Sequence, residues 1–198
     1  KRLVLVGLST GERRVVASGD RFDLEIAPGG RWVAVLANGR DRQSEAGPTN
    51  TGMAPQQRRL LIVDLASSAV AEPCPGCDVM QSLLAWSAKG DRLLVFTRTG
   101  DDWAKGGFQK IDVATGRAQP VALGGLTPVL TRKRDHGNWA AGAWLGETPV
   151  IYARPPGSDR ADWYELAASE PRVLTSALAT PSPRLLAVDA TSLIVADG

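Results

Sequence analysis

Residues 86–116 read WSAKGDRLLVFTRTGDDWAKGGFQKIDVATG and contain both parts of a pattern that recurs along the chain. The first part is an apolar run that ends on a tight polar turn, as in residues 108–116, and it returns at residues 3–11, 60–68 and, in degraded form, 163–169. The second part is a turn followed by an apolar run, as in residues 87–96, and it returns at residues 27–35, 144–152 and 189–195.

The spacing of these parts indicates a repeat made only of short strands. Gly7, Asp64 and Asp112 stand 57 and 48 residues apart in the first part, and Gly30 and Gly90 stand 60 apart in the second. Each apolar run is too short for an amphipathic helix and is bounded by turn-forming residues. Two hairpins per repeat make a four-stranded sheet, which must stack on its neighbours to bury its faces. The sequence therefore predicts an all-β fold, a β-propeller of four-stranded antiparallel blades.

The order of the parts predicts about four blade equivalents and about sixteen strands. These are a half-blade at 1–17, whole blades at about 20–75, 78–123 and 139–176, and a half-blade at 183–198. No helix longer than two turns is expected within residues 3–123. The terminal halves could pair to close a four-bladed ring, or the chain could be a segment of a larger propeller. We expect the second, because the sequence lacks an initiator Met and stops just after a strand.

Composition narrows the classes of partner. The chain has 198 residues, 43% of them hydrophobic, and no run approaches the ~18 apolar residues of a membrane span. The net charge is +2 with acids and bases interspersed, so the single-sign stripe of a nucleic-acid binder is missing. We therefore expect peptides or protein surfaces as partners, with no nucleic acid and no membrane span.

The pair Cys74 and Cys77 allows three interpretations. A zinc site needs four ligands, and only His136 remains beyond the two thiols, so no metal is expected. A redox motif would need a surrounding βαβ pattern. A small disulfide, or two thiols, in the connection between two blades fits best, and a disulfide would favour a periplasmic or secreted protein over the cytoplasmic alternative.

A candidate nucleophile stands at Ser9, because Gly7-Leu8-Ser9-Thr10-Gly11 is a literal G-x-S-x-G. A nucleophile elbow needs a strand, a sharp turn and then a helix, so that the hydroxyl lies beside an oxyanion-binding N–H. Residues 12–17 instead predict a returning strand. We therefore expect Ser9 to be a turn residue.

The remaining candidates for catalysis are equally weak. His136, the sole histidine, lies in a polar loop where a solvated imidazole is the ordinary state. Asp64 and Asp112 occupy matching repeat positions, which indicates a repeated turn hydrogen bond instead of an acid pair. No catalytic residue, cofactor or metal is expected in this chain.

The connections are expected to differ between the two faces of the propeller. Hairpin turns on one face are tight, whereas the other face carries the long segments 39–59, 98–107, 124–139 and 154–162. Long loops confined to one face favour a surface that binds a substrate or a partner. We expect that surface to include Arg132, Arg134, His136 and Trp139, accompanied by Arg40, Arg42, Trp103 and Lys133.

The repeats also resemble those of a known family. Ile-Asp-Val-Ala-Thr-Gly at 111–116, the segment 86–96 and Ala-Pro-Gly-Gly-Arg-Trp-Val-Ala at 27–34 are similar to blades of the N-terminal propeller of the prolyl oligopeptidase family of serine peptidases. The Tol-type periplasmic propeller shares these motifs. In the peptidases the propeller caps an α/β-hydrolase domain and filters substrates by size. The resemblance carries no catalytic residue onto this chain.

Two functions follow from this comparison. The resemblance to the peptidases implies a non-catalytic propeller that gates or binds peptide substrate for a downstream serine-peptidase domain. The alternative is a non-enzymatic periplasmic propeller that binds proteins as a scaffold.

Overall fold

The structure of the chain is a computed structural model that describes residues 1–19, 22–38, 58–98, 100, 102–133, 137–167 and 170–197. Within these ranges the regular elements are nineteen β-strands and one 3-10 turn, η1 (Trp103–Lys105). No helix in the described part is long and apolar enough to cross a membrane. The predicted all-β class is therefore confirmed.

Three antiparallel sheets of blade type form the body of the molecule. The first blade contains β3 (Phe22–Ile26), β4 (Trp32–Asn38), β5 (Arg58–Asp64) and β6 (Val70–Ala71). The second contains β7 (Asp78–Trp86), β8 (Arg92–Arg98), β9 (Gly107–Asp112) and β10 (Arg117–Pro120). The third contains β14 (Gly142–Leu145), β15 (Thr148–Arg154), β16 (Asp162–Glu165) and β17 (Arg172–Val173). In each blade, consecutive strands pair with one another.

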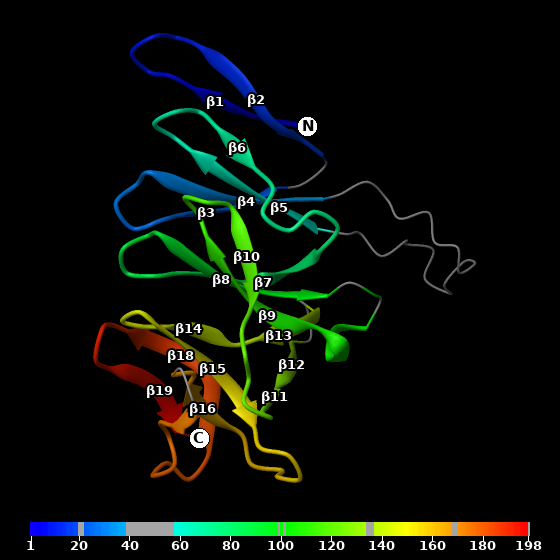
Figure 1. Cartoon of the computed structure of the whole chain (residues 1–198), viewed down its shortest axis with the longest axis vertical. Helices are drawn as coiled ribbons and strands as arrows, with labels where there is room; N and C mark the ends of the chain where they lie inside the picture. The colour runs from blue at the N-terminus through cyan, green and yellow to red at the C-terminus, as the bar shows by residue number, and fades with distance from the viewer. Residues whose placement is uncertain are drawn as a thin grey trace, which may run out of the picture.

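A two-stranded hairpin lies at each end of this body. The N-terminal half-blade is β1 (Arg2–Val6) with β2 (Arg13–Ser18), and the C-terminal half-blade is β18 (Pro181–Val188) with β19 (Leu193–Asp197). Figure 1 shows the sheets stacked in chain order, with the two half-blades at opposite ends of the stack. The described residues thus form an open row of blades, in agreement with the predicted four blade equivalents.

Three short strands go beyond the sixteen that the repeats predict. They are β11 (Thr127–Pro128), which extends the third blade by pairing with β15, and the hairpin of β12 (Leu130–Lys133) and β13 (Gly137–Ala140). The polar composition of residues 124–139 predicts a loop, and the structure corrects this. Ala140 is fully buried, and its N–H points at the Met80 sulfur 3.1 Å away, so the hairpin is held against β7.

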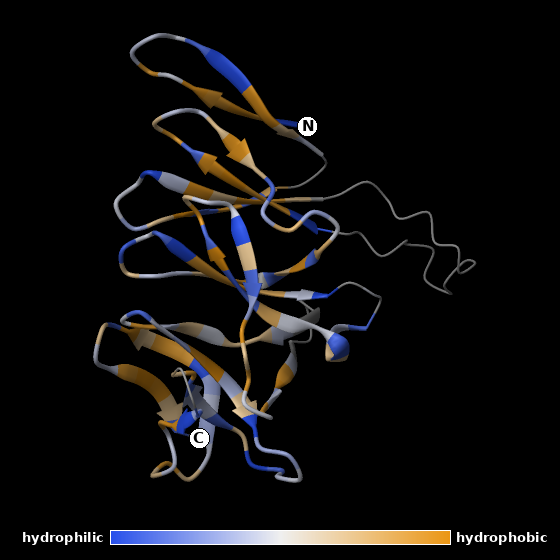
Figure 2. Cartoon of the chain, viewed as in Figure 1, coloured by the Kyte–Doolittle hydropathy of each residue, from blue (hydrophilic) through white to orange (hydrophobic). Residues whose placement is uncertain are grey.

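The blades are held together by apolar side chains that alternate along each strand. On β8, Leu93 and Val95 pack toward the first blade, whereas Leu94 and Phe96 pack toward the third. All four are at most 1% exposed. A strand with a sheet on each side is buried on both faces, which explains its continuous apolar sequence. Figure 2 shows hydrophobic residues concentrated in the strands of the blades.

Glycine is needed where the turn between β7 and β8 contacts the first blade. Gly90, in the turn between β7 and β8, has a φ of +69° and accepts no side chain, because a Cβ there would lie 2.4 Å from the carbonyl oxygen of Pro28. Gly29, in the equivalent turn of the first blade, has a φ of +85° but open space around it. The first turn therefore needs glycine for its backbone alone, and the second needs it also for the contact between blades.

Candidate functional site

The molecule has two rims of different construction (Figure 1). The tight-turn rim consists of the hairpin turns at residues 7–12, 27–31, 65–69, 87–91, 113–116, 146–147 and 189–192. The loop-rich rim consists of the connections at residues 72–77, 102–106, 155–161 and 174–180 together with the hairpin β12–β13. Most of the long connections lie on the right of the figure, the one between β17 and β18 lies at the bottom, and the tight turns lie on the left.

Carboxylates on the tight-turn rim stabilise their own turns. Asp64 Oδ1 accepts the N–H of Ala66 at 2.9 Å, and Asp112 Oδ1 accepts the N–H of Thr115 at 2.8 Å. The hydrogen bond from Arg31 lowers the pKa of Asp64 to about 2, and the backbone N–H of Thr115 lowers the pKa of Asp112. The prediction that these two residues make a repeated turn hydrogen bond is confirmed.

Ser9 lies in the hairpin turn between β1 and β2. The N–H of Gly7 donates to the carbonyl oxygen of Glu12 at 2.9 Å, and the N–H of Gly11 donates to that of Gly7 at 2.7 Å. The segment after the turn is the strand β2, as expected from the sequence. The strand–turn–helix context of a nucleophile elbow is therefore missing at this position.

The loop-rich rim contains a buried ion pair that neutralises its own charges. Asp78 and Arg98 face each other across β7 and β8, and Arg98 Nε donates to Asp78 Oδ2 at 2.8 Å. Their side chains are only 8% and 11% exposed. Asp78 Oδ1 also accepts the N–H of Arg58 at 2.9 Å, so one carboxylate joins the rim ends of β5, β7 and β8. Such a pair fixes geometry because either charge alone would be costly to bury.

This ion pair supports an aromatic side chain at the surface. The Arg98 guanidinium lies 4.3 Å from the centre of the Trp103 ring, and Trp103 also contacts Phe96. Asp102 begins the turn η1 by accepting the N–H of Ala104 at 2.9 Å, and the N–H of Gly106 closes it on the Trp103 carbonyl. The half-buried indole is therefore held against a cation.

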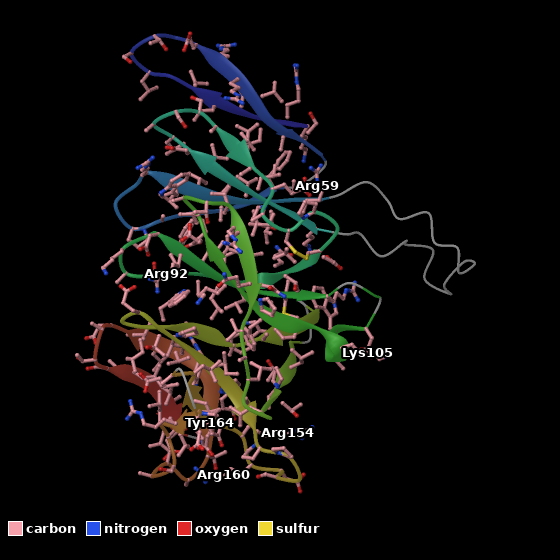
Figure 3. All side chains as sticks on the ribbon, viewed as in Figure 1. Arg59, Arg92, Lys105, Arg154, Arg160 and Tyr164 are labelled. Carbon is pink, nitrogen blue, oxygen red and sulfur yellow. A yellow bond between two sulfur atoms is a disulfide. The ribbon has the colours of Figure 1, made fainter. Side chains whose placement is uncertain are left out.

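Basic side chains accompany Trp103 along the loop-rich rim. Figure 3 shows Arg59 and Lys105 on the side of the long connections and Arg92 on the side of the tight turns. Arg59 pairs with Glu72, and Arg92 pairs with Glu147 at 3.2 Å. Lys105 is exposed in η1, and among the described residues no carboxylate forms an ion pair with it.

A second carboxylate, that of Asp162, joins two connections farther along the same rim. Arg160 binds both oxygens of Asp162, at 2.8 and 3.0 Å, and donates to the Leu178 carbonyl at 2.8 Å. Thr175 donates its hydroxyl to Asp162 at 2.9 Å. The hydrogen bond from Arg160 lowers the pKa of Asp162. The connections 155–161 and 174–180 are thereby joined.

The predicted site residues divide into three groups. Arg132 lies in β12 beside Asn138 of β13, so the backbone places it one rung from Trp139. Trp139 is half-buried and packs against the apolar core between the third blade and the C-terminal half-blade. Arg134 and His136, like Arg40 and Arg42, lie outside the residues that the structure describes. The structure thus brings Arg132 and Trp139 onto one hairpin.

Cys74 and Cys77 are joined by a disulfide in the connection between the first and second blades. The N–H of Cys77 donates to the Cys74 carbonyl at 3.2 Å, and Cys77 packs in the core between these blades. In the described part of the chain no group of three or more His, Cys, Asp or Glu residues could hold a metal ion.

No family model and no curated protein sequence matches the chain. Among solved structures, TolB from Acinetobacter baumannii is similar to 91% of the chain, with 12% identity and a TM-score of 0.46. An acylaminoacyl peptidase from Pyrococcus horikoshii is similar to 86%, with 16% identity and a TM-score of 0.47. The β-propeller domain of the Trilobed protease from Pyrococcus furiosus is similar to 98%, with 12% identity and a TM-score of 0.43.

The chain spans 39%, 27% and 70% of the lengths of these three structures. At such identities and TM-scores they show no family, and the propeller fold is assigned from the strand pairing of this chain.

Proposed function

We propose that the chain is a non-catalytic propeller that binds peptide through its loop-rich rim. The observation that carries the proposal is Trp103 held on Arg98, with the exposed Lys105 two residues away. An aromatic face beside a cation without a partner among the described residues suits a peptide with acidic or aromatic side chains. On the opposite rim, Asp64 and Asp112 accept backbone N–H groups of their own turns.

The same proposal extends to a longer protein that contains this propeller. A rim that binds peptide could gate or deliver substrate to a serine-peptidase domain in the same protein, with Arg132, Arg134, His136 and Trp139 contributing to the rim. The Cys74–Cys77 disulfide supports a periplasmic or secreted location, because disulfides persist in oxidising compartments. A scaffold propeller that binds a folded protein through the same rim is the competing function.

Peptide binding by the 198-residue protein tests the proposal. Labelled short peptides rich in Glu and Phe should bind, and fluorescence anisotropy should show a loss of about tenfold in affinity for Trp103→Ala and for Lys105→Glu. Arg117→Glu is the matched control, because Arg117 is exposed on β10 near the tight-turn rim and should leave the affinity unchanged. Equal losses in all three variants would contradict a site on the loop-rich rim.

Kinetics on the full-length protein separate the two functions. If the rim gates substrate for a peptidase domain, Arg132→Glu should raise KM or change the preferred substrate size, with the melting temperature nearly unchanged. Unaltered kinetics with every peptide tried, combined with retained binding to a folded partner, would favour the scaffold function.

A further inference from the structure

A hairpin interrupts the innermost strand of the third blade. β11 pairs with the end of β15 and β14 pairs with its beginning, so both lie along the same edge of β15. Between them, the N–H of Val129 donates to the carbonyl oxygen of Tyr152 at 3.2 Å, and the N–H of Tyr152 donates to the carbonyl oxygen of Ala141 at 3.0 Å. Residues 130–140, which contain β12 and β13, are therefore inserted into this strand near the loop-rich rim.

One strand of the hairpin is anchored, and the other has an open edge. β13 lies against β7, and the N–H of Ala140 points at the sulfur of Met80. On the other side of β13, the hydroxyl of Thr131 donates to the carbonyl oxygen of Trp139 at 3.4 Å, so this carbonyl faces β12. Among the described strands, β12 pairs with β13 alone.

The register of the hairpin shows which backbone groups lie on the open edge. Successive residues of an antiparallel pair direct their N–H and C=O groups toward the partner strand and then away from it. Ala140 directs its N–H toward β7, so Leu130, its partner in register, directs its own groups away from β13. Two residues farther along β12, Arg132 does the same. The open edge thus presents the N–H and C=O groups of Leu130 and Arg132.

This edge borders the same apolar cluster as the aromatic site of the loop-rich rim. Leu130 and Trp103 both pack against the cluster that includes Met80 and Phe96. Figures 1 and 3 show the hairpin and Lys105 on the side of the long connections. Side chains alternate between the two faces of a strand, so a strand added to β12 places every second side chain on the face of Leu130, toward this cluster.

We propose that an extended acidic peptide binds by adding a strand to the open edge of β12. This inference rests on the proposed function and specifies how the loop-rich rim holds its peptide. Hydrogen bonds to the backbone of Leu130 and Arg132 give affinity, and alternate peptide side chains reach Trp103 and Lys105.

Charge favours an acidic peptide as the occupant of this edge. β12 itself contains the cations Arg132 and Lys133. Among the described residues, no carboxylate forms an ion pair with Lys105. The same cations disfavour pairing with β12 of a second copy, because like charges on facing strands repel each other.

N-methylation of the peptide tests the hydrogen bonds without changing the protein. The probe is fluorescein-labelled Thr-Glu-Val-Phe-Glu-Thr, whose single Phe fixes the register, and each backbone amide is methylated in turn. An added strand directs every second N–H toward its neighbour. Fluorescence anisotropy should therefore show about fivefold losses of affinity at alternate positions and little change between them. Equal losses at adjacent positions, or no loss at any position, would overturn strand addition.

A pair of protein variants removes one donor of the open edge. Arg132→Pro and Arg132→Ala both lose the side chain, but only Arg132→Pro loses the outward N–H, and proline is tolerated on an edge strand at such a position. The two variants should therefore have similar melting temperatures, and Arg132→Pro should bind the probe about fivefold more weakly. Equal affinities in two folded variants would contradict the proposal. If Arg132→Pro does not fold, the methylation series decides alone.

The proposed function and strand addition fail in different ways. If neither this probe nor other peptides rich in Glu and Phe bind, both are wrong. If the probe binds and loses affinity with Trp103→Ala, but methylation shows no alternation, the rim holds its peptide through side chains and only strand addition is wrong.

Discussion

The connections of the tight-turn rim and those of the loop-rich rim are held in place by different side-chain interactions. On the tight-turn rim, Asp64 and Asp112 each satisfy backbone N–H groups within a few residues of themselves, and Asp64 also binds Arg31 of the neighbouring turn. On the loop-rich rim, Asp78 and Asp162 bind arginines, and they join segments far apart in the sequence. Local hydrogen bonds hold much of each short turn, whereas long connections need anchors, and anchored connections can present side chains such as Trp103 to a ligand.

The largest difference between the rims should appear when one carboxylate is removed from each. Asp78→Ala removes the buried carboxylate that binds the nearly buried Arg98 and the N–H of Arg58, and it should reduce the free energy of unfolding by about 3–5 kcal/mol. Asp112→Ala, on the tight-turn rim, removes an exposed turn hydrogen bond and should cost about 1 kcal/mol. Urea denaturation measures both. Equal losses would mean that the two rims are anchored in the same way.

Alanine substitutions at Gly29 and Gly90 distinguish the stability cost of the backbone conformation from the cost of disturbing the contact between blades. Gly29→Ala should cost about 1–2 kcal/mol, because φ is positive but the space around the residue is open. Gly90→Ala should cost more, because the added methyl group also meets the Pro28 carbonyl of the neighbouring blade. Thermal unfolding of the two variants gives the comparison. A smaller loss for Gly90→Ala would show that the two turns are not in contact.

The smallest expected effect is the response of the tight-turn rim to acid. Arg31 holds the pKa of Asp64 at about 2 in the folded protein, below the ordinary value of 3.8. A lowered folded-state pKa adds stability above pH 3.8, and that stability is lost as the pH falls toward 2. Asp64→Asn should therefore lower the melting temperature at pH 6 and have less effect near pH 2. An equal effect at both pH values would rule out a role for the carboxylate charge.

Many strands and turns could be predicted from the sequence, because the pattern of apolar residues along a strand and the residue types of a turn are local features of the chain. The run at 93–96 is apolar on both faces and follows Gly90 and Asp91, and the segment 108–112 alternates Phe and Ile with polar residues and ends at Asp112, so their strands and turns can be recognised without tertiary information. The strands β11, β12 and β13 could not, because their polar residues form strands only through pairing and through packing of β13 on β7.

The candidate site was predicted in part. Because Trp103 lies in a long connection, the sequence predicted it to be on the surface. Nothing in the sequence indicates that Asp78 forms an ion pair with Arg98. The two residues are 20 positions apart, and only the register of β7 against β8 places them opposite each other. Charged residues at strand ends usually remain in water, so burial of this pair is a tertiary effect.

Hydrogen exchange with and without a bound acidic peptide tests the central claim most directly, because it reports on both rims in one experiment. The peptide should slow exchange at the amides of residues 102–107 on the loop-rich rim, and it should leave residues 87–91 and 113–116 on the tight-turn rim unchanged. Protection confined to the tight turns, or no protection at any peptide concentration that saturates the anisotropy signal, would contradict the assignment of binding to the loop-rich rim.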